Sequence, residues 1–217
     1  METTTGTFTA AISGVLAPPN YSSISTYPYN TVVLIETVNP NNPGFFSFGS
    51  GVVIGPHTIL TASHMLWDSA HQGEANQVWL YPAYYQNGIP NPPGSLGPIN
   101  ANLVWHNYIV GVPGQNLISQ SDSQYDFAVI DTDYTFTSWM GVSLDYGGGA
   151  VNVTGYPATA NGIQTSASGV VSKDPNYSLL DYPNNFVSPG NSGGPLWNYF
   201  NGSFDVVGVS TGLWGPS

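Results

Sequence analysis

The chain has no cysteine and almost no basic side chain. Lys173 is its single lysine or arginine among 217 residues, against 12 carboxylates, so the formal net charge is -11. The missing cysteines exclude disulfides and thiolate metal sites. The missing basic residues leave no positive patch for nucleic acid or for an anionic membrane surface, and we expect neither as a partner.

Long apolar runs and a secretion signal are also absent. No stretch approaches the ~18 apolar residues of a membrane span, and the first residues lack the basic start and apolar run of a signal peptide. Scarce lysine with abundant Gly, Pro and Tyr (26, 18 and 14 residues) suits an extracellular all-β protein. We therefore expect a secreted protein whose signal peptide is not part of this sequence.

Apolar residues make up 41% of the chain, enough for a sizeable core, and their pattern favours an all-β sandwich or barrel. Helical periodicity is scarce, so we expect no more than one helical turn, after His64, and long loops at 84–100 and 111–124. A glycine run at 147–149 is the best candidate for a joint between two units, residues 1–146 and 147–217. The clearest expected strands are 31–36, 50–54, 58–61, 77–81, 127–131, 150–154, 169–172 and 204–210.

A serine between glycines is the first chemical signal, in the run P-G-N-S-G-G-P-L at 189–196. Flanking glycines permit a tight turn that exposes the Ser192 hydroxyl and frees backbone N–H groups for an oxyanion hole, here those of Gly190 and Ser192. The run also satisfies G-x-S-x-G, the nucleophile elbow of α/β-hydrolases. The motif alone therefore does not decide the fold.

The order of residues is more informative, because all four histidines (57, 64, 71 and 106) precede Ser192. An α/β-hydrolase esterase places its acid and its histidine after the serine, so only the order His, Asp, Ser remains. His64 follows two strands and the small residues 62 and 63, which let an imidazole approach a neighbouring barrel. His57 and His71 are interpreted as solvated and His106 as a surface or half-buried residue. No ligand cluster accompanies them, so no metal or cofactor is expected.

The candidate acid is Asp126, at the head of the apolar strand 127–131. A buried carboxylate needs a hydrogen-bond partner, which the Nδ1–H group of His64 would supply. Asp131 and Asp133 are interpreted as a solvated strand end.

Three runs together resemble the signature blocks of chymotrypsin-like serine proteases: T-A-S-H at 61–64, D-F-A-V-I at 126–130 and G-N-S-G-G-P at 190–195. G-Y-P at 155–157 resembles the bacterial branch that includes the glutamyl endopeptidases. The resemblance implies two antiparallel six-stranded β-barrels with the active site in the cleft between them. It also implies a serine endopeptidase that acts on peptides or proteins through an acyl-enzyme on Ser192, with His64 as general base and Asp126 orienting it.

The sequence departs from its relatives at two places. Asn191 replaces the Asp that digestive members pair with a new amino terminus made by cleavage after Lys or Arg, and no such residue precedes Lys173. Other contacts must therefore hold the oxyanion loop. Val187 and Ser210 stand where glutamyl-specific relatives have the Thr and His that bind a substrate carboxylate. The expected pocket carries no charge and predicts small or medium apolar P1 residues; it consists of Phe186, Val187, Ser210, Thr211, Gly212 and Leu213.

A catalytically silent two-barrel binding module is the alternative. It is disfavoured because all three catalytic positions and both glycines of the serine motif are intact. The chain ends five residues after Gly212, without the helix that often closes this family, which is compatible with a catalytic part of a longer polypeptide.

Overall fold

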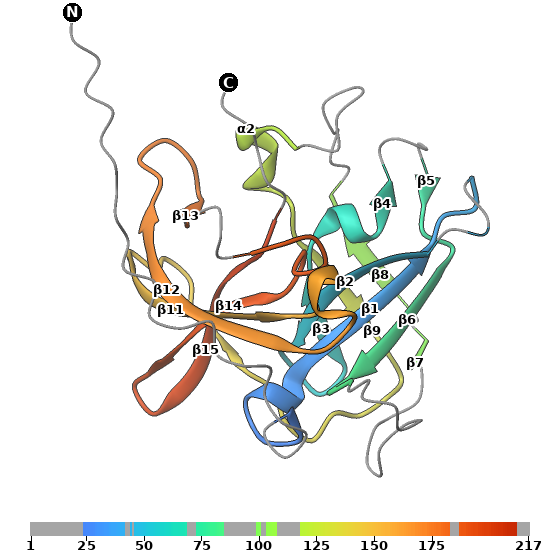
Figure 1. Ribbon diagram of the computed structural model, residues 1–217, viewed down its shortest axis with the longest axis horizontal. Coiled ribbons are helices and arrows are strands. Elements are labelled where there is room, and N and C mark those ends of the chain that lie inside the picture. Colours follow the sequence, from blue (N-terminus) through green and yellow to red (C-terminus); the bar gives the residue numbers. More distant parts are fainter. Residues whose placement is uncertain are drawn as a thin grey trace, which may run out of the picture.

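The computed structural model describes residues 24–41, 44, 46–68, 73–84, 99–100, 103–107, 118–182 and 187–211. Two curled main sheets lie side by side, the first drawn in blue to green and the second in yellow to red (Figure 1). The fold is all-β and of the two-barrel kind, as predicted. The second sheet has the expected six strands, whereas the first has seven because the short edge strand β7 (Ile99–Asn100) joins it.

The first sheet runs in the order β7-β6-β1-β2-β3-β9-β8, and all of its pairs are antiparallel. Alternate residues of its strands, such as Val33 and Ile35, are fully buried in the core of this sheet. Its other strands are β1 (Val32–Val38), β2 (Phe46–Val53), β3 (Thr58–Thr61), β6 (Gln77–Pro82), β8 (Leu103–His106) and β9 (Ala128–Asp131).

The second sheet runs in the order β10-β15-β14-β11-β12-β13, and only the β10–β15 pair is parallel. It begins at Gly141, ahead of the glycine run, and Gly148 and Gly149 are paired residues of β11. The change from one sheet to the other therefore falls between residues 131 and 141. The strands are β10 (Gly141–Val142), β11 (Gly148–Gly155), β12 (Thr165–Lys173), β13 (Leu180–Asp181), β14 (Pro195–Phe200) and β15 (Ser203–Val209).

A shared core joins the two sheets. Val32 and Leu34 of β1 pack in one buried cluster with Tyr156 and with Trp197 of β14. The 3-10 helix η1 (Tyr29–Thr31) adds the Tyr29 ring, whose centroid lies 6.0 Å from that of Trp197. This interface holds the facing loops of the two sheets in a fixed relation.

The helices are short. η2 (Ser63–Met65) carries His64 and is followed by the hairpin of β4 (Trp67–Asp68) and β5 (Gly73–Glu74), and η3 is Ala158–Ala160. α2 (Gln120–Ser123) lies in a segment that was predicted as loop. A helical turn forms there because the Ser119 hydroxyl caps it by accepting from the Asp122 N–H at 3.1 Å. Among the described residues, no helix is long and apolar enough to cross a membrane.

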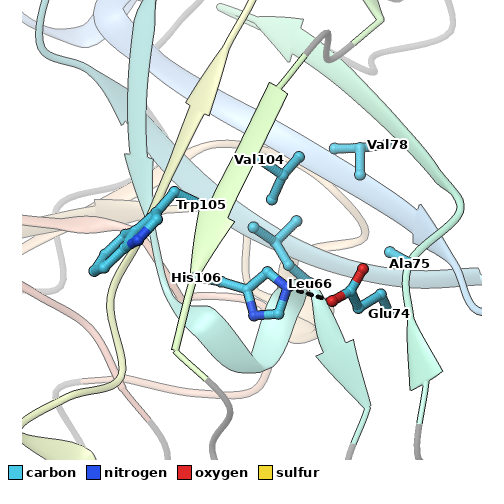
Figure 2. A pocket seen from close by; sticks show the side chains of 7 residues that line it. All are labelled: Leu66, Glu74, Ala75, Val78, Val104, Trp105 and His106. Atoms are coloured by element: carbon cyan, nitrogen blue, oxygen red, sulfur yellow. Dashed lines mark ion pairs between the residues drawn. The ribbon is translucent and has the colours of Figure 1, made fainter.

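A cavity of about 340 Å³ opens where the first sheet curls round on itself (Figure 2). β6 and β8 border it, and they lie near opposite edges of that sheet, so the cavity marks the seam that the strands leave unclosed. At the seam, His106 Nε2 lies 3.5 Å from Glu74 Oε1, and the His106 ring stacks on Trp67. Val78, Val104 and Leu66 form the apolar part of the wall.

Candidate active site

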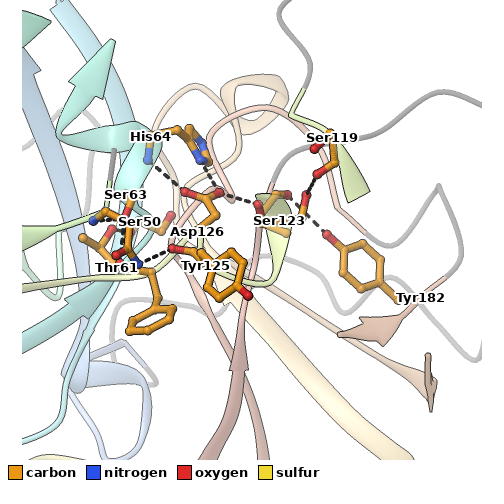
Figure 3. Close-up of polar contacts among 12 residues, drawn as sticks. Ser50, Thr61, Ser63, His64, Ser119, Ser123, Tyr125, Asp126 and Tyr182 are labelled. Atoms are coloured by element: carbon orange, nitrogen blue, oxygen red, sulfur yellow. Dashed lines mark hydrogen bonds and ion pairs between the residues drawn. The ribbon is translucent and has the colours of Figure 1, made fainter. Parts of the chain in front are cut away.

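Strand pairing brings His64 and Asp126 together. Thr61, the last residue of β3, pairs with Ala128, the first residue of β9, so the chain leaving β3 and the chain entering β9 meet at the same end of these two strands. The Ser63 hydroxyl links the two segments by donating to the Phe127 carbonyl at 2.6 Å. His64 and Asp126 extend from that strand end toward each other (Figure 3).

The Asp126 carboxylate binds His64 twice. Its Oδ2 lies 2.6 Å from His64 Nδ1, and its Oδ1 accepts from the His64 backbone N–H at 2.9 Å. Burial of Asp126, 3% exposed, raises the pKa of its carboxyl, but the charge of His64 and three hydrogen bonds outweigh burial and lower that pKa below its ordinary value. The carboxylate is therefore held ionised, with Nδ1 of His64 as the ring's protonated nitrogen and Nε2 left to accept a proton.

The third hydrogen bond comes from Thr211, two residues after the end of β15. Its hydroxyl donates to Asp126 Oδ2, and its carbonyl accepts from the Tyr182 hydroxyl at 3.5 Å. Thr211 was predicted as a pocket residue from its position alone. That role stays a prediction, and the structure adds a hydrogen bond from the Thr211 hydroxyl to the buried carboxylate, a contact between residues 85 apart that no local pattern indicates.

Ser192 lies in a tight turn before β14. Gly190 and Gly193 have φ angles of +96° and +80°, and a Cβ atom on either would overlap backbone oxygens, of Tyr156 and of Ser50 respectively. Any other residue type would therefore displace the turn. The Asn191 carbonyl accepts from the Gly194 N–H at 2.8 Å, and the Gly193 N–H donates to the Ser210 carbonyl at 2.7 Å.

Ser50 of β2 holds this turn against the first sheet, a role that sequence reasoning missed. Its backbone N–H donates to the Ser192 carbonyl at 2.7 Å, and its hydroxyl donates to the Gly190 carbonyl at 2.7 Å. The same hydroxyl accepts from the Tyr156 N–H at 2.8 Å. One fully buried side chain thus connects β2, the residue after β11 and the serine turn. These contacts are of the kind expected to hold the oxyanion loop in a chain that has Asn191 where digestive relatives have Asp.

The hydroxyl and the backbone amides of the serine turn are the remaining groups of the candidate site. Within the described part of the chain, the Ser192 hydroxyl makes no hydrogen bond to His64, and the N–H groups of Gly190 and Ser192 have no acceptor. Catalytic hydrogen bonds are often long in free enzymes and tighten when substrate binds. A hydroxyl, an oriented imidazole and two free amides are the groups that acyl transfer needs.

Half of the predicted pocket can be placed. Val187 packs beside the core of the second sheet, and Ser210 is 1% exposed at the end of β15. Among the described residues, Ser210 Oγ and Asn191 Oδ1 are buried without a hydrogen-bond partner. Phe186, Gly212 and Leu213 lie outside the described residues, as does His71.

The other histidines lie elsewhere. His57 is exposed in the turn before β3, with its Nδ1 3.0 Å from the Tyr134 carbonyl, and His106 is half-buried at the seam of the first sheet.

Residues 49–209 match the family model described as "Trypsin-like peptidase domain". The chain belongs to this family. The trypsin-like peptidase domain defined by that match runs from β2 to the end of β15, and so includes His64, Asp126 and Ser192. Comparison of the sequence with curated proteins finds no significant match.

Solved structures similar to this trypsin-like peptidase are proteases. Protease Anisep from Arthrobacter nicotinovorans is 22% identical with a TM-score of 0.63, over 86% of this chain and 85% of that chain. A thermostable serine protease, AL20, from an extremophilic microorganism is 17% identical with a TM-score of 0.65, over 86% of each chain. A Glu endopeptidase is 24% identical with a TM-score of 0.62, over 87% of this chain and 81% of that chain. At these identities the likeness establishes the two-barrel serine protease fold.

Proposed function

We propose that this chain is a secreted serine endopeptidase in which Ser192 is the nucleophile, His64 the general base and Asp126 the residue that orients His64. The doubly bound, buried Asp126 carboxylate carries the proposal, because it fixes both the ring and the backbone of His64. The family match and the protease neighbours agree with a peptidase. A peptide or protein is the corresponding substrate.

The reaction follows from these groups. Ser192 Oγ attacks the scissile carbonyl carbon while Nε2 of His64 takes the hydroxyl proton, and the N–H groups of Gly190 and Ser192 bind the oxyanion that forms. The C–N bond then breaks as His64 gives the proton to the leaving amine. Water attacks the acyl-enzyme by the same route, which releases the acid and restores Ser192.

For the residue on the acyl side we propose a small or medium apolar side chain. Val187 and Ser210 bring no charge to this region, so neither an acidic nor a basic P1 side chain would be neutralised there. A cleavage profile on a peptide library measures this preference. Predominance of charged P1 residues would contradict it.

The direct test is Ser192→Ala with labelling by a fluorophosphonate. The wild-type protein should be labelled at Ser192 and should cleave peptides, whereas Ser192→Ala should do neither and should keep the wild-type melting temperature. An active Ser192→Ala protein would refute the assignment. A wild-type protein that is neither labelled nor active would instead favour the silent binding module.

A further inference from the structure

An exposed aromatic surface surrounds one carboxylate on the outer side of the first sheet. Glu36 of β1 pairs with Phe48 on one side and with Trp79 on the other, so the three side chains share a face. Phe46 joins them, with its ring centroid 5.7 Å from that of Trp79. Phe46 and Phe48 are 53% and 55% exposed. We call Glu36, Phe46, Phe48 and Trp79 the aromatic face.

The aromatic face continues directly from the serine turn. Phe48 lies two residues before Ser50 on β2, so both side chains point to the same side of the sheet, about 7 Å apart along the strand. Ser50 contacts the carbonyls of Ser192 and Gly190. In an extended peptide, as in β2, every second side chain points to the same side. A substrate peptide that runs from Ser192 alongside β2 would therefore bring one of its alternate side chains to Phe48.

The leaving half of a substrate is the half that takes this path. His64 must give its proton to the leaving amine, so that half begins beside His64, which the first sheet carries. The acyl half enters the region of Val187 and Ser210 on the second sheet. β2, with the aromatic face, belongs to the first sheet.

The chemistry of the face favours a cation. Glu36 accepts from the Tyr81 hydroxyl at 2.9 Å, and an apolar occupant would cover its carboxylate without replacing the lost water. A guanidinium or ammonium group neutralises that carboxylate and also stacks on Phe and Trp rings, and its alkyl stem packs on them. The net charge of -11 further favours cationic chains.

We propose that the aromatic face binds an arginine or lysine side chain at the second residue of the leaving half of the substrate. This proposal rests on the proposed function, because it takes Ser192 and His64 as the reacting groups. It makes Glu36 and Phe48 specificity-determining residues that contact substrate.

The test compares peptides that differ only at that residue: arginine, its neutral isostere citrulline, norleucine and glutamate. For the wild-type protein, kcat/KM for arginine should exceed that for citrulline about fivefold at low salt, and the ratio should fall toward one at 0.5 M NaCl. The glutamate peptide should be the poorest. A wild-type ratio of about one at low salt overturns the proposal.

Variants locate the effect. Glu36→Gln keeps an acceptor for Tyr81 and should bring the ratio of arginine to citrulline to about one. Phe48→Ala should lower kcat/KM several-fold for arginine and norleucine alike. Phe200→Ala on β14 removes an equally exposed ring, 55%, far along the chain from β2 and should leave the ratio unchanged. An unchanged ratio in Glu36→Gln overturns the proposal.

Fluorophosphonate labelling of a separate aliquot of each protein distinguishes the two proposals. If that aliquot is labelled at Ser192 and the unlabelled protein cleaves all four peptides equally, only the proposal for the aromatic face is contradicted. Protein that is neither labelled nor active contradicts the proposed function, and the inference about Glu36 with it.

Discussion

Replacement of Ser50 by alanine should damage stability and catalysis together. The substitution removes the hydroxyl that donates to the Gly190 carbonyl and accepts from the Tyr156 N–H. The Tyr156 amide is buried, and an unsatisfied buried donor costs about 1–3 kcal/mol. Loss of the hydrogen bond to the Gly190 carbonyl, which is partly exposed, lowers the unfolding free energy by about another 1 kcal/mol. The total is about 2–4 kcal/mol of unfolding free energy, or a melting temperature lower by roughly 4–16 °C for a domain of this size.

The catalytic loss follows from the position of the same turn. Gly190 supplies one expected oxyanion donor, and removal of a whole donor costs roughly 10²–10³ in turnover. A displaced rather than deleted donor should cost about 10–100-fold in kcat. Urea unfolding, peptide hydrolysis and the rate of fluorophosphonate labelling measure the two effects. Thr61→Val, which removes only a hydroxyl bound to the Ser50 carbonyl, is the matched control. A Ser50→Ala protein with wild-type stability and labelling rate would refute the role given to Ser50.

Two further predictions concern Asp126 and the serine turn. Thr211→Val removes a donor to Asp126 and should raise the pKa of that carboxyl, lower kcat about tenfold and cost about 1–2 kcal/mol at pH 7. Because a depressed carboxyl pKa adds stability above about pH 4 that is lost as the pH falls through the folded pKa, the difference from wild type should shrink as the pH falls below about 4 in melting series. A difference that stays constant from pH 7 to the acid end of the series would contradict this account. Gly193→Ala places a Cβ atom against the Ser50 carbonyl at φ +80° and should cost more than about 3 kcal/mol, whereas Gly202→Ala at φ +86° has open space and should cost about 1 kcal/mol. Chemical denaturation compares the two, and equal losses would contradict the steric argument.

Much of the fold was predictable because the strands are bounded by clear turn residues. β3 was predicted at its observed bounds, and the strand at 77–81 differs from β6 by one residue. β14 was missed since it begins with proline and alternates poorly, and β8 since it is short and lies between loop-like segments. Tertiary pairing, which local sequence does not encode, stabilises both.

The candidate site divides in the same way. His64, Asp126 and Ser192 could be selected by their order and flanking residues. Ser50 could not, because its partner Gly190 is 140 residues away and a serine in a strand is an ordinary surface residue. The hydrogen bond from Thr211 to Asp126 could not be predicted either, because it depends on the path of the chain after β15.

The hydrogen bond between Thr211 and Asp126 also bears on how the protein is synthesised. The hydrogen bond that steadies Asp126 comes from Thr211, and the contacts that steady the serine turn come from Ser50. Neither half of the molecule holds the complete candidate site, so we expect a growing chain to reach its full activity only after residue 211 has folded into place. A nascent chain should therefore be a poorer peptidase than the finished protein while it is still being synthesised.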